Sequence, residues 1–385
     1  MNKFDKKKLR ILHIVIDEKF TDIIIDEFKY FEKYIENHFV ICKGEDITNF
    51  KYLKQKESVV HIPKGMLNIY IQENKINVCI LHSLRCASII TLLRIPSHIK
   101  LIWFAWGFDL YKTPTRDPFI KLDCYKPLTK KYLKGLNNNN LKKILKNYIE
   151  DFLLRILVRR IDFFSGCLPV EYELMKKCAC FKAKPLDFSY SKISSNPHSV
   201  IPCSRVSGEN ILVGNSGDES NNHLDIFECL KKLDIKEKKI YVPLSYAGSK
   251  DYIERVKYIG HKYFGDNFIA LETFLPVDAY KTIISSCGFL IYGHERQQAL
   301  GNIDLGLRSG CKIFLSKTSV NYDYFTSIGC VVFSIQDGLT TESISNGLDE
   351  ASYIRNINVM QSERSPYVCY NKLKKIIETL YNVID

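Results

Sequence analysis

Two series of short apolar segments, each alternating with segments of helical periodicity, constrain the fold of this chain more than any other feature. In the first series the β-rich segments lie at residues 11–16, 39–42, 59–62, 78–81, 101–105 and 163–166. In the second they lie at residues 211–213, 240–244, 268–271, 289–292, 313–315 and 331–333. This alternation is typical of parallel sheets with crossover helices. We therefore predict an α/β protein with two Rossmann-like, doubly wound domains facing a cleft.

The length of the chain agrees with two domains, because 385 residues exceed what one ordinary hydrophobic core organises. Residues 182–208 are irregular and rich in Pro and Ser, as in a linker. We expect amphipathic helices near residues 23–35 and 367–383. The predicted boundaries are a first domain at 1–190, a linker at 191–208, a second domain at 209–362 and a C-terminal helix at 363–385, which could cross back to the first domain.

Composition excludes several classes of protein. No apolar run reaches the roughly 18 to 20 residues that a membrane-spanning helix needs. Residues 11–16 follow three lysines, but the stretch is short and contains His13, so we interpret it as a strand and not a secretion signal. The thirteen cysteines have no framework spacing, which favours reduced thiols in a reducing compartment. Cys178 and Cys180 lack a second pair of ligands, so no zinc site is expected.

The net charge of +12 is concentrated in one segment. Between Lys126 and Arg160, ten Lys and Arg residues stand against Glu150 and Asp151, an excess of eight positive charges, and apolar residues recur among them at helical spacing. Such a pattern fits either a solvated helix face or a basic amphipathic surface that contacts anionic lipid or pyrophosphate. No nucleic-acid recognition motif accompanies it, so nucleic acid is not an expected partner.

The second domain carries two segments suited to a diphosphate. An apolar strand at 211–213 ends in a turn rich in Gly, Ser and Asn (214–222), and a helix begins soon after. Glycine allows close approach of a ligand to the backbone, and free N–H groups at a helix start attract anions, although many such turns serve only to reverse the chain. After the strand ending at Tyr292, Arg296 could neutralise a departing diphosphate, or serve as a surface helix cap.

In the first domain, aromatic residues surround one carboxylate at 103–111, directly after a strand. Aromatic rings beside a carboxylate suit a sugar, whose apolar face stacks while its hydroxyls need acceptors. Asp109 or His82 could act as the general base that removes a proton from an acceptor hydroxyl, and for each the alternative is a structural hydrogen bond. No D-x-D pair occurs anywhere in the chain, so we expect a metal-independent reaction without a cofactor.

These segments together resemble a known family. The sequences Val213–His223, Trp106–Tyr111, Val242-Pro243 with Tyr246, Tyr252–Glu254, Asp278–Tyr280 and Arg296–Gln298 with Gly301 are similar to the TDP-N-acetylfucosamine:lipid II N-acetylfucosaminyltransferase family. This family is also described as 4-alpha-L-fucosyltransferase-like, glycosyltransferase family 56. The similarity is dense in the second domain and patchy in the first. Phe108, the pair His294-Glu295 and the long basic segment 129–153 depart from the family pattern.

The resemblance implies a fold of the GT-B type and a glycosyltransferase that moves a deoxy or acetamido sugar, such as N-acetylfucosamine or fucose, from a nucleotide-diphosphate donor, with TDP expected. The acceptor would be a polyprenyl-diphosphate-linked saccharide in surface polysaccharide synthesis, which places the protein on the cytoplasmic side of the bacterial inner membrane as a peripheral protein. The expected acceptor-binding residues are Trp106, Gly107 and Tyr111. The expected donor-binding residues are Gly214, Asn215, Ser216, Gly217, Asp218, Ser220, His223, Tyr246, Arg296, Gln297, Gln298 and Gly301.

Two alternatives remain open from the sequence. A nucleotide-sugar epimerase of the same fold would need no acceptor, and a non-catalytic nucleotide-sugar-binding partner would bind the donor without turnover.

Overall fold

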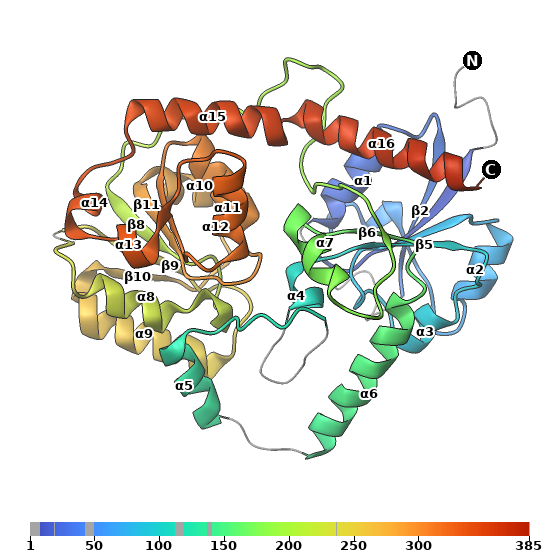
Figure 1. The fold of residues 1–385 in the computed structure, drawn as a ribbon, viewed down its shortest axis with the longest axis horizontal. Coiled ribbons are helices and arrows are strands. Elements are labelled where there is room, and N and C mark those ends of the chain that lie inside the picture. Colours follow the sequence, from blue (N-terminus) through green and yellow to red (C-terminus); the bar gives the residue numbers. More distant parts are fainter. Residues whose placement is uncertain are drawn as a thin grey trace. The chain divides into compact units, whose positions relative to one another are not determined.

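The computed structural model describes residues 8–18, 20–42, 50–111, 119–136, 141–235 and 237–384, with the side chains at 136, 141–144 and 277 left out. The chain divides into two compact units. Unit 1 comprises Met1–Lys121, Asn140–Ser199 and Ser365–Asp385, and unit 2 comprises Leu122–Asn139 and Val200–Arg364. In each unit, helices cover both faces of a parallel sheet (Figure 1).

Unit 1 contains a seven-stranded sheet in the order β3-β2-β1-β4-β5-β6-β7, in which every pairing is parallel. Its strands are β1 (Leu9–Ile14), β2 (Ile35–Ile41), β3 (Val59–His61), β4 (Val78–Leu81), β5 (Lys100–Phe104), β6 (Phe163–Ser165) and β7 (Lys184–Pro185). The helices of unit 1 are α1 (Thr21–Lys29), α2 (Leu67–Glu73), α3 (Ile89–Leu93), α4 (Gly107–Leu110), α6 (Leu141–Val158), α7 (Pro169–Lys176) and α16 (Pro366–Ile384).

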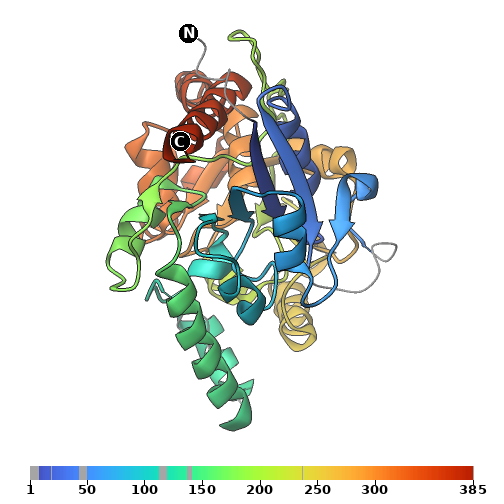
Figure 2. The same cartoon turned by 90° about the vertical axis from the view of Figure 1, so that its right-hand side faces the viewer.

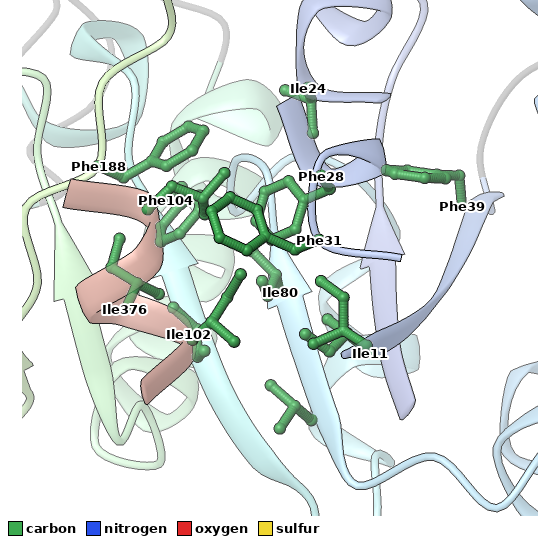
Figure 3. Packing of buried hydrophobic residues seen from close by; sticks show 14 of the residues in the cluster. Ile11, Ile24, Phe28, Phe31, Phe39, Ile80, Ile102, Phe104, Phe188 and Ile376 are labelled. Atoms are coloured by element: carbon green, nitrogen blue, oxygen red, sulfur yellow. The ribbon is translucent and has the colours of Figure 1, made fainter. Parts of the chain in front are cut away.

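The last helix of the chain completes the core of unit 1. Leu373, Ile376, Ile377 and Leu380 of α16 are buried in the same cluster as the apolar residues of β1, β4 and β5. Figure 3 shows Ile376 beside Ile102 and below the stacked rings of Phe104 and Phe188. Burying a side chain of this size contributes about 1.5–3 kcal/mol, so α16 is a structural part of unit 1.

Unit 2 contains a six-stranded parallel sheet in the order β10-β9-β8-β11-β12-β13. Its strands are β8 (Asn210–Val213), β9 (Ile240–Pro243), β10 (Phe268–Leu271), β11 (Cys287–Tyr292), β12 (Lys312–Leu315) and β13 (Phe333–Ser334). The helices of unit 2 are α5 (Pro127–Leu136), α8 (His223–Leu230), α9 (Lys250–Phe264), α10 (Val277–Ser285), α11 (Leu300–Arg308), α12 (Val320–Ser327), α13 (Ile335–Gly338), α14 (Thr341–Ser345) and α15 (Glu350–Arg364).

Each sheet has one point where the strand order reverses, between β1 and β4 in unit 1 and between β8 and β11 in unit 2. The loops that follow the two strands at such a point diverge to opposite faces of the sheet. Ligands of open parallel sheets bind in the crevice outside the carboxyl ends of the strands there. The structure therefore directs attention to the residues just after β1 and β4, and just after β8 and β11.

The strands follow the sequence prediction closely, and the fold class is confirmed. Two elements differ from the expectation. The helix expected at 23–35 ends at Lys29, because Ile35 pairs with Leu9 and begins β2, so a long-range strand pairing overrides the local helical period. The short strand β7 was not expected.

The segment 122–136 belongs to unit 2, although it lies within the range 1–190 that the sequence assigned to the first domain. The reason is a set of contacts with the N-terminal end of α8. Asp225 accepts hydrogen bonds from the backbone N–H groups of Leu128 and Thr129 at 2.9 and 3.0 Å, and from the Thr129 hydroxyl at 2.8 Å. These bonds satisfy donors at the start of α5 that have no partner within the helix.

The described residues can also be compared with the predictions about membrane-spanning helices and cysteines. None of the helices in these ranges is both long and apolar enough to cross a membrane. All thirteen cysteines are free thiols, and the sulfur atoms of Cys178 and Cys180 lie 3.2 Å apart in a hydrogen bond, not a disulfide.

Candidate active site

The loops that follow β8 and β11 meet at the reversal point of unit 2 and contain most of the residues assigned to the donor. Gly214, the first residue after β8, has a φ of +72°, and a Cβ there would come within 2.8 Å of Asn221 Oδ1 and His223 Nε2. Both the backbone conformation and the crowding require glycine. The turn after β8 is therefore held against the start of α8.

Asn221 connects the two loops through its side-chain amide. Its Nδ2 donates to Ser216 O at 3.0 Å and to Asp218 O at 2.8 Å. Its Oδ1 accepts from the Asn215 backbone N–H at 2.9 Å and from His294 Nε2 at 2.7 Å. Because Asn221 is fully buried, these bonds fix the loop geometry.

Arg296 lies in the loop after β11 and reaches the loop after β8. Its Nε donates to the Ser220 hydroxyl at 3.2 Å, and its Nη2 lies 3.6 Å from Asp218 Oδ1. Burial would raise the pKa of Asp218, but the Arg296 guanidinium and the bonds from Ser220 outweigh it and hold that pKa below its usual value. The Arg296 side chain is only 16% exposed, so its charge is partly desolvated and interacts more strongly with nearby charges than it would in water.

Gln298 and Asn215 extend the same network. Gln298 Oε1 lies 2.6 Å from the Ser220 hydroxyl, and Gln298 Nε2 donates to Asn215 Oδ1 at 3.0 Å. Asn215 Nδ2 donates to the Tyr246 hydroxyl at 3.0 Å. The structure thus brings together six of the residues predicted to bind the donor, from the loops after β8, β9 and β11.

The remaining predicted donor residues have other surroundings. His223 begins α8, packs on Gly214 and is neutral, since burial lowers its pKa to about 3. A Cβ at Gly217 would lie 2.8 Å from Ala247 O, so this glycine permits a close contact with the loop after β9. At Gly301 a Cβ would meet nothing within 4 Å, so no close approach requires glycine there. Gln297 is buried beside Arg296.

The pair His294-Glu295, which departs from the family pattern, has a structural explanation. Glu295 accepts hydrogen bonds from Ser316 and Thr318, both at 2.7 Å, and forms an ion pair with Lys126 at 2.6 Å. Lys126 Nζ also donates to Ser316 at 3.0 Å. The sequence placed Lys126 either on a solvated helix face or on a basic surface that contacts lipid or pyrophosphate, but the structure places its ammonium in this network of unit 2.

In unit 1 the structure distinguishes the two candidate bases. Asp109 uses both carboxylate oxygens: Oδ1 accepts from Ser83 at 2.8 Å, and Oδ2 accepts from Trp106 N at 3.3 Å and Trp103 Nε1 at 3.4 Å. Burial raises its pKa to about 6, against these bonds. His82, directly after β4, has an Nδ1 atom that is buried and without a hydrogen-bond partner in the described part of the chain. Asp109 therefore anchors the turn, and His82 keeps one nitrogen available.

The three residues predicted to bind the acceptor have different environments in the structure. The Tyr111 hydroxyl donates to the buried Glu171 carboxylate at 2.9 Å, which fits a structural role. Gly107 is the first residue of α4. The Trp106 indole N–H is buried and lacks a partner among the described residues, so it remains able to bind a ligand.

The sequence did not reveal several contacts that the structure shows at these sites. Lys126 and Glu295 lie 169 positions apart in the chain, and no local pattern joins them. His13 lies inside β1 and contacts His82, which only the pairing of β1 with β4 reveals. In the described ranges, no group of three or more His, Cys, Asp or Glu side chains could hold a metal ion.

Comparison with known proteins identifies the family. Residues 163–356, just over half of the chain, match the family described as 4-alpha-L-fucosyltransferase, glycosyl transferase group 56. The chain belongs to this family. It is accordingly a glycosyltransferase, and the match includes the Gly214 turn, Asn221 and Arg296 of the site described above.

Solved structures similar to this family member have the GT-B fold. A glycosyltransferase from Rickettsia africae has a TM-score of 0.58 at 13% identity, covering 97% of this chain and 99% of that one. The Anabaena protein HepE, solved with UDP and glucose, has a TM-score of 0.52 at 10% identity, covering 98% of each chain. OtsA in its apo form has a TM-score of 0.58 at 9% identity, covering 96% of this chain and 99% of that one. The two Rossmann-like units of this chain thus belong to a fold of the GT-B type.

The Lys126–Glu295 pair gives a prediction about unit 2 of this family member. Their side chains are 17% and 8% exposed, so Lys126→Met leaves a buried carboxylate without its cation. We expect Lys126→Met to lower the free energy of unfolding, measured by urea titration with circular dichroism, by at least about 1 kcal/mol. Adding Glu295→Gln should recover part of the loss.

Lys130→Met is the matched control, because Lys130 pairs with Asp123 at 47% and 59% exposure. Exposed pairs contribute about 0–1 kcal/mol, so this variant should change stability little. Equal losses for the two lysine variants would contradict a special role for the buried pair.

Proposed function

We propose that this glycosyltransferase moves a deoxy or acetamido sugar, such as N-acetylfucosamine or fucose, from a nucleotide-diphosphate donor, TDP in the first instance, to a saccharide linked to polyprenyl diphosphate. The product would enter surface polysaccharide synthesis. The single observation that supports the donor assignment is the position of Arg296, partly buried at the strand-order reversal of unit 2 and tied to the loop after β8.

A departing nucleoside diphosphate needs positive charge and hydrogen-bond donors. Arg296 can supply a planar fork of N–H groups, which suits two phosphate oxygens better than an ammonium does. In the absence of ligand its Nη2 faces Asp218, so a diphosphate would compete with that carboxylate for the guanidinium. The HepE structure, which contains UDP and glucose, lends support to a nucleotide sugar as the donor.

The acceptor is assigned to unit 1 in this proposal. Trp106 offers an aromatic surface and an indole N–H, and His82 offers its Nδ1; neither atom has a hydrogen-bond partner among the described residues. During transfer the acceptor hydroxyl forms a bond to the anomeric carbon, the bond from that carbon to the phosphate oxygen breaks, and the hydroxyl proton passes to His82. The electron pair leaves with the diphosphate, which Arg296 stabilises.

The same proposal places the protein at the cytoplasmic face of the bacterial inner membrane, with α6 as the contact. Leu145, Tyr148, Ile149 and Phe152 are 51–76% exposed and recur at helical spacing along α6. Figure 2 shows one end of this helix projecting from unit 1. The other end of α6 is anchored by buried Leu154, Leu157 and Val158. Exposed apolar stripes of this kind mark interaction surfaces.

This surface is smaller than the sequence indicated. Lys126 and Lys130 form ion pairs in unit 2, and Arg160 donates to the carbonyls of Leu93 and Ile95 at 3.1 and 2.8 Å. Lys142 and Lys143 lie outside the described side chains. Lys146 is exposed beside the stripe, and Arg159 is exposed just after the anchored end of α6, so we propose that apolar insertion dominates and that charge assists.

Arg296→Ala should weaken donor binding or turnover by at least about tenfold, equivalent to about 1.4 kcal/mol, through loss of charge-assisted hydrogen bonds. A thermal-shift screen of nucleotide sugars measures the binding, since a ligand at about 100 times its dissociation constant adds about 2.7 kcal/mol of stability. Arg296→Lys should restore only part of the affinity. The exposed Arg255 on α9 provides the control, Arg255→Ala. Unchanged affinity in folded Arg296→Ala would remove this residue from the donor site.

Activity should survive removal of divalent cations. The chain has no D-x-D pair, and Arg296 with neighbouring amide donors takes the role that a metal has in many nucleotide-sugar transferases. The transfer rate should therefore be equal within about twofold in EDTA and in Mg²⁺. Neither the proton transfer to His82 nor the departure of the diphosphate uses a metal in this proposal. Loss of activity in EDTA with recovery in Mg²⁺ or Mn²⁺ would refute this account of the leaving group.

Replacing Leu145, Tyr148 and Phe152 with Ser should release the protein from vesicles containing anionic phospholipid, because the apolar area that inserts is removed. Co-sedimentation over a salt series measures the binding. The control replaces Tyr258 and Phe274 of unit 2, which are 60% and 51% exposed, with Ser. If the α6 variant and the control bind vesicles equally, α6 is not the membrane contact.

A further inference from the structure

Three buried polar atoms without partners gather at one place in unit 1. Within the described residues, His82 Nδ1, Trp106 Nε1 and the Tyr190 hydroxyl make no hydrogen bond. The Tyr190 ring contacts both of the others, with ring centroids 6.4 Å from His82 and 5.7 Å from Trp106. Trp106 lies near enough to the Tyr190 hydroxyl to lower its pKa, against the larger raising effect of burial, yet the geometry of a hydrogen bond is not met.

A buried polar group without a partner loses its hydration and gains no hydrogen bond in return, so three such groups in one cluster need an explanation. All three lie beyond the carboxyl ends of strands: His82 follows β4, Trp106 follows β5 and Tyr190 follows β7. His82 stands at the point where the strand order reverses. This is where a ligand of an open parallel sheet is expected, and a ligand would satisfy the three groups.

A chain of hydrogen bonds determines which nitrogen of His82 carries the proton. Asn37 Nδ2 donates to Phe28 O at 3.3 Å, so Asn37 Oδ1 is the atom that faces His13 Nε2 at 3.2 Å. His13 Nε2 must therefore be protonated and donate. Burial lowers the pKa of His13 to about 3, so its ring is neutral and its Nδ1 is an acceptor.

His82 completes the chain. Its Nε2 lies 3.1 Å from His13 Nδ1 and must donate to it. Burial, together with the nearby His13, lowers the pKa of His82 well below its usual value, so this ring is also neutral. The remaining nitrogen, Nδ1, then carries a lone pair. The hydrogen bond made by one ring nitrogen sets the state of the other.

We propose that Asn37 and His13 are positioning residues that hold His82 in the form with a free lone pair on Nδ1, and that His82, Trp106 and Tyr190 together bind the acceptor sugar. This inference rests on the proposed function. The His82 lone pair receives the hydroxyl proton, and the Trp106 N–H and the Tyr190 hydroxyl donate to oxygens of the same sugar. Neither His13 nor Asn37 touches the substrate.

The chemistry of the step follows from this arrangement. As the acceptor oxygen bonds to the anomeric carbon, its proton moves to His82 Nδ1, and the imidazolium so formed keeps its Nε2 hydrogen bond to His13. The leaving diphosphate takes the electron pair of the broken bond. In a catalytic triad a carboxylate orients the histidine base, whereas here the neutral His13 has that place. His13 orients His82 without adding a negative charge, so His82 stays unprotonated before the substrate arrives.

A sugar can reach the three atoms only if the side chains that cover them move, because each of the atoms is buried. Tyr190 is half-buried and lies in a stretch without helix or strand between β7 and β8. Its ring contacts Phe20 at 6.0 Å and Phe188 at 4.8 Å between centroids. Movement of this one ring would expose His82 and Trp106 to a sugar, whose apolar face could stack on the aromatic rings.

The first test measures the state of each imidazole nitrogen by NMR of the ¹⁵N-labelled full chain, where protonated and unprotonated nitrogens have separate chemical shifts. We expect His82 to be protonated at Nε2 and unprotonated at Nδ1. In His13→Phe, which removes the acceptor for Nε2, His82 should populate both forms. In His13→Asn, whose Oδ1 takes the place of Nδ1, the single form should return. Protonation of His82 at Nδ1 in the parent protein would overturn the proposal.

The second test compares kinetics with the TDP-sugar found by the thermal-shift screen and a saccharide on a polyprenyl diphosphate. His82→Phe should lower kcat by roughly 10²–10⁴-fold. His13→Phe should lower kcat at least about tenfold with the donor KM unchanged, and His13→Asn should restore most of it. Tyr190→Phe should raise the acceptor KM. Full kcat in folded His13→Phe would refute the positioning role.

Two controls separate a specific effect from general destabilisation. His38→Phe replaces a histidine of β2 that contacts Tyr70 and Glu36, and Tyr172→Phe removes a hydroxyl that donates to Ala183 O. Both should leave kcat and KM unchanged. If no nucleotide sugar binds or reacts, the proposed function fails, while the NMR result still decides the hydrogen-bond chain by itself.

Discussion

The parallel pairing of β1 with β4 and of β8 with β11 is the constraint on which the rest of this structure depends. At each of these pairs the strand order reverses, so the chain leaves neighbouring strands toward opposite faces of the sheet. In unit 2 this brings Gly214 and Arg296 to one edge. In unit 1 the register that places His13 opposite Ile80 also brings His13 to His82. Both candidate sites are consequences of strand order.

Burial determines the charge of the groups at these edges. The histidines His13, His82, His223 and His294 are all fully buried, and desolvation lowers the pKa of each, so they are neutral donors and acceptors rather than cations. Arg296 is different, because a guanidinium stays charged, and here it has Asp218 as a partner. Unit 2 therefore offers fixed positive charge, which suits a diphosphate. Unit 1 offers neutral hydrogen-bonding groups, which suit a sugar hydroxyl.

The segment 122–136 lies between two parts of unit 1 in the sequence but belongs to unit 2, and a buried ion pair helps to hold it there. Its sequence is basic and amphipathic, and it is continuous with α6 in composition. The pair between Lys126 and Glu295, together with the cap that Asp225 provides for α5, joins this segment to unit 2. The membrane contact that we propose therefore depends on α6, in which most of the exposed side chains among those described are apolar.

The sequence by itself determined the strands other than β7 and the fold class, because apolar periodicity and turn residues act locally and a parallel sheet needs crossover helices. It also indicated the Gly214 turn, Arg296 and His82, since chemistry-bearing residues directly after strands lie at the sheet edge. Only the tertiary structure decided that Asp109 and Tyr111 have their polar atoms occupied, that Lys126 neutralises Glu295, and that Asn37 and His13 set the form of His82. The physical reason is that hydrogen bonding and desolvation depend on which distant residues meet, and strand order and burial determine those meetings while local sequence does not.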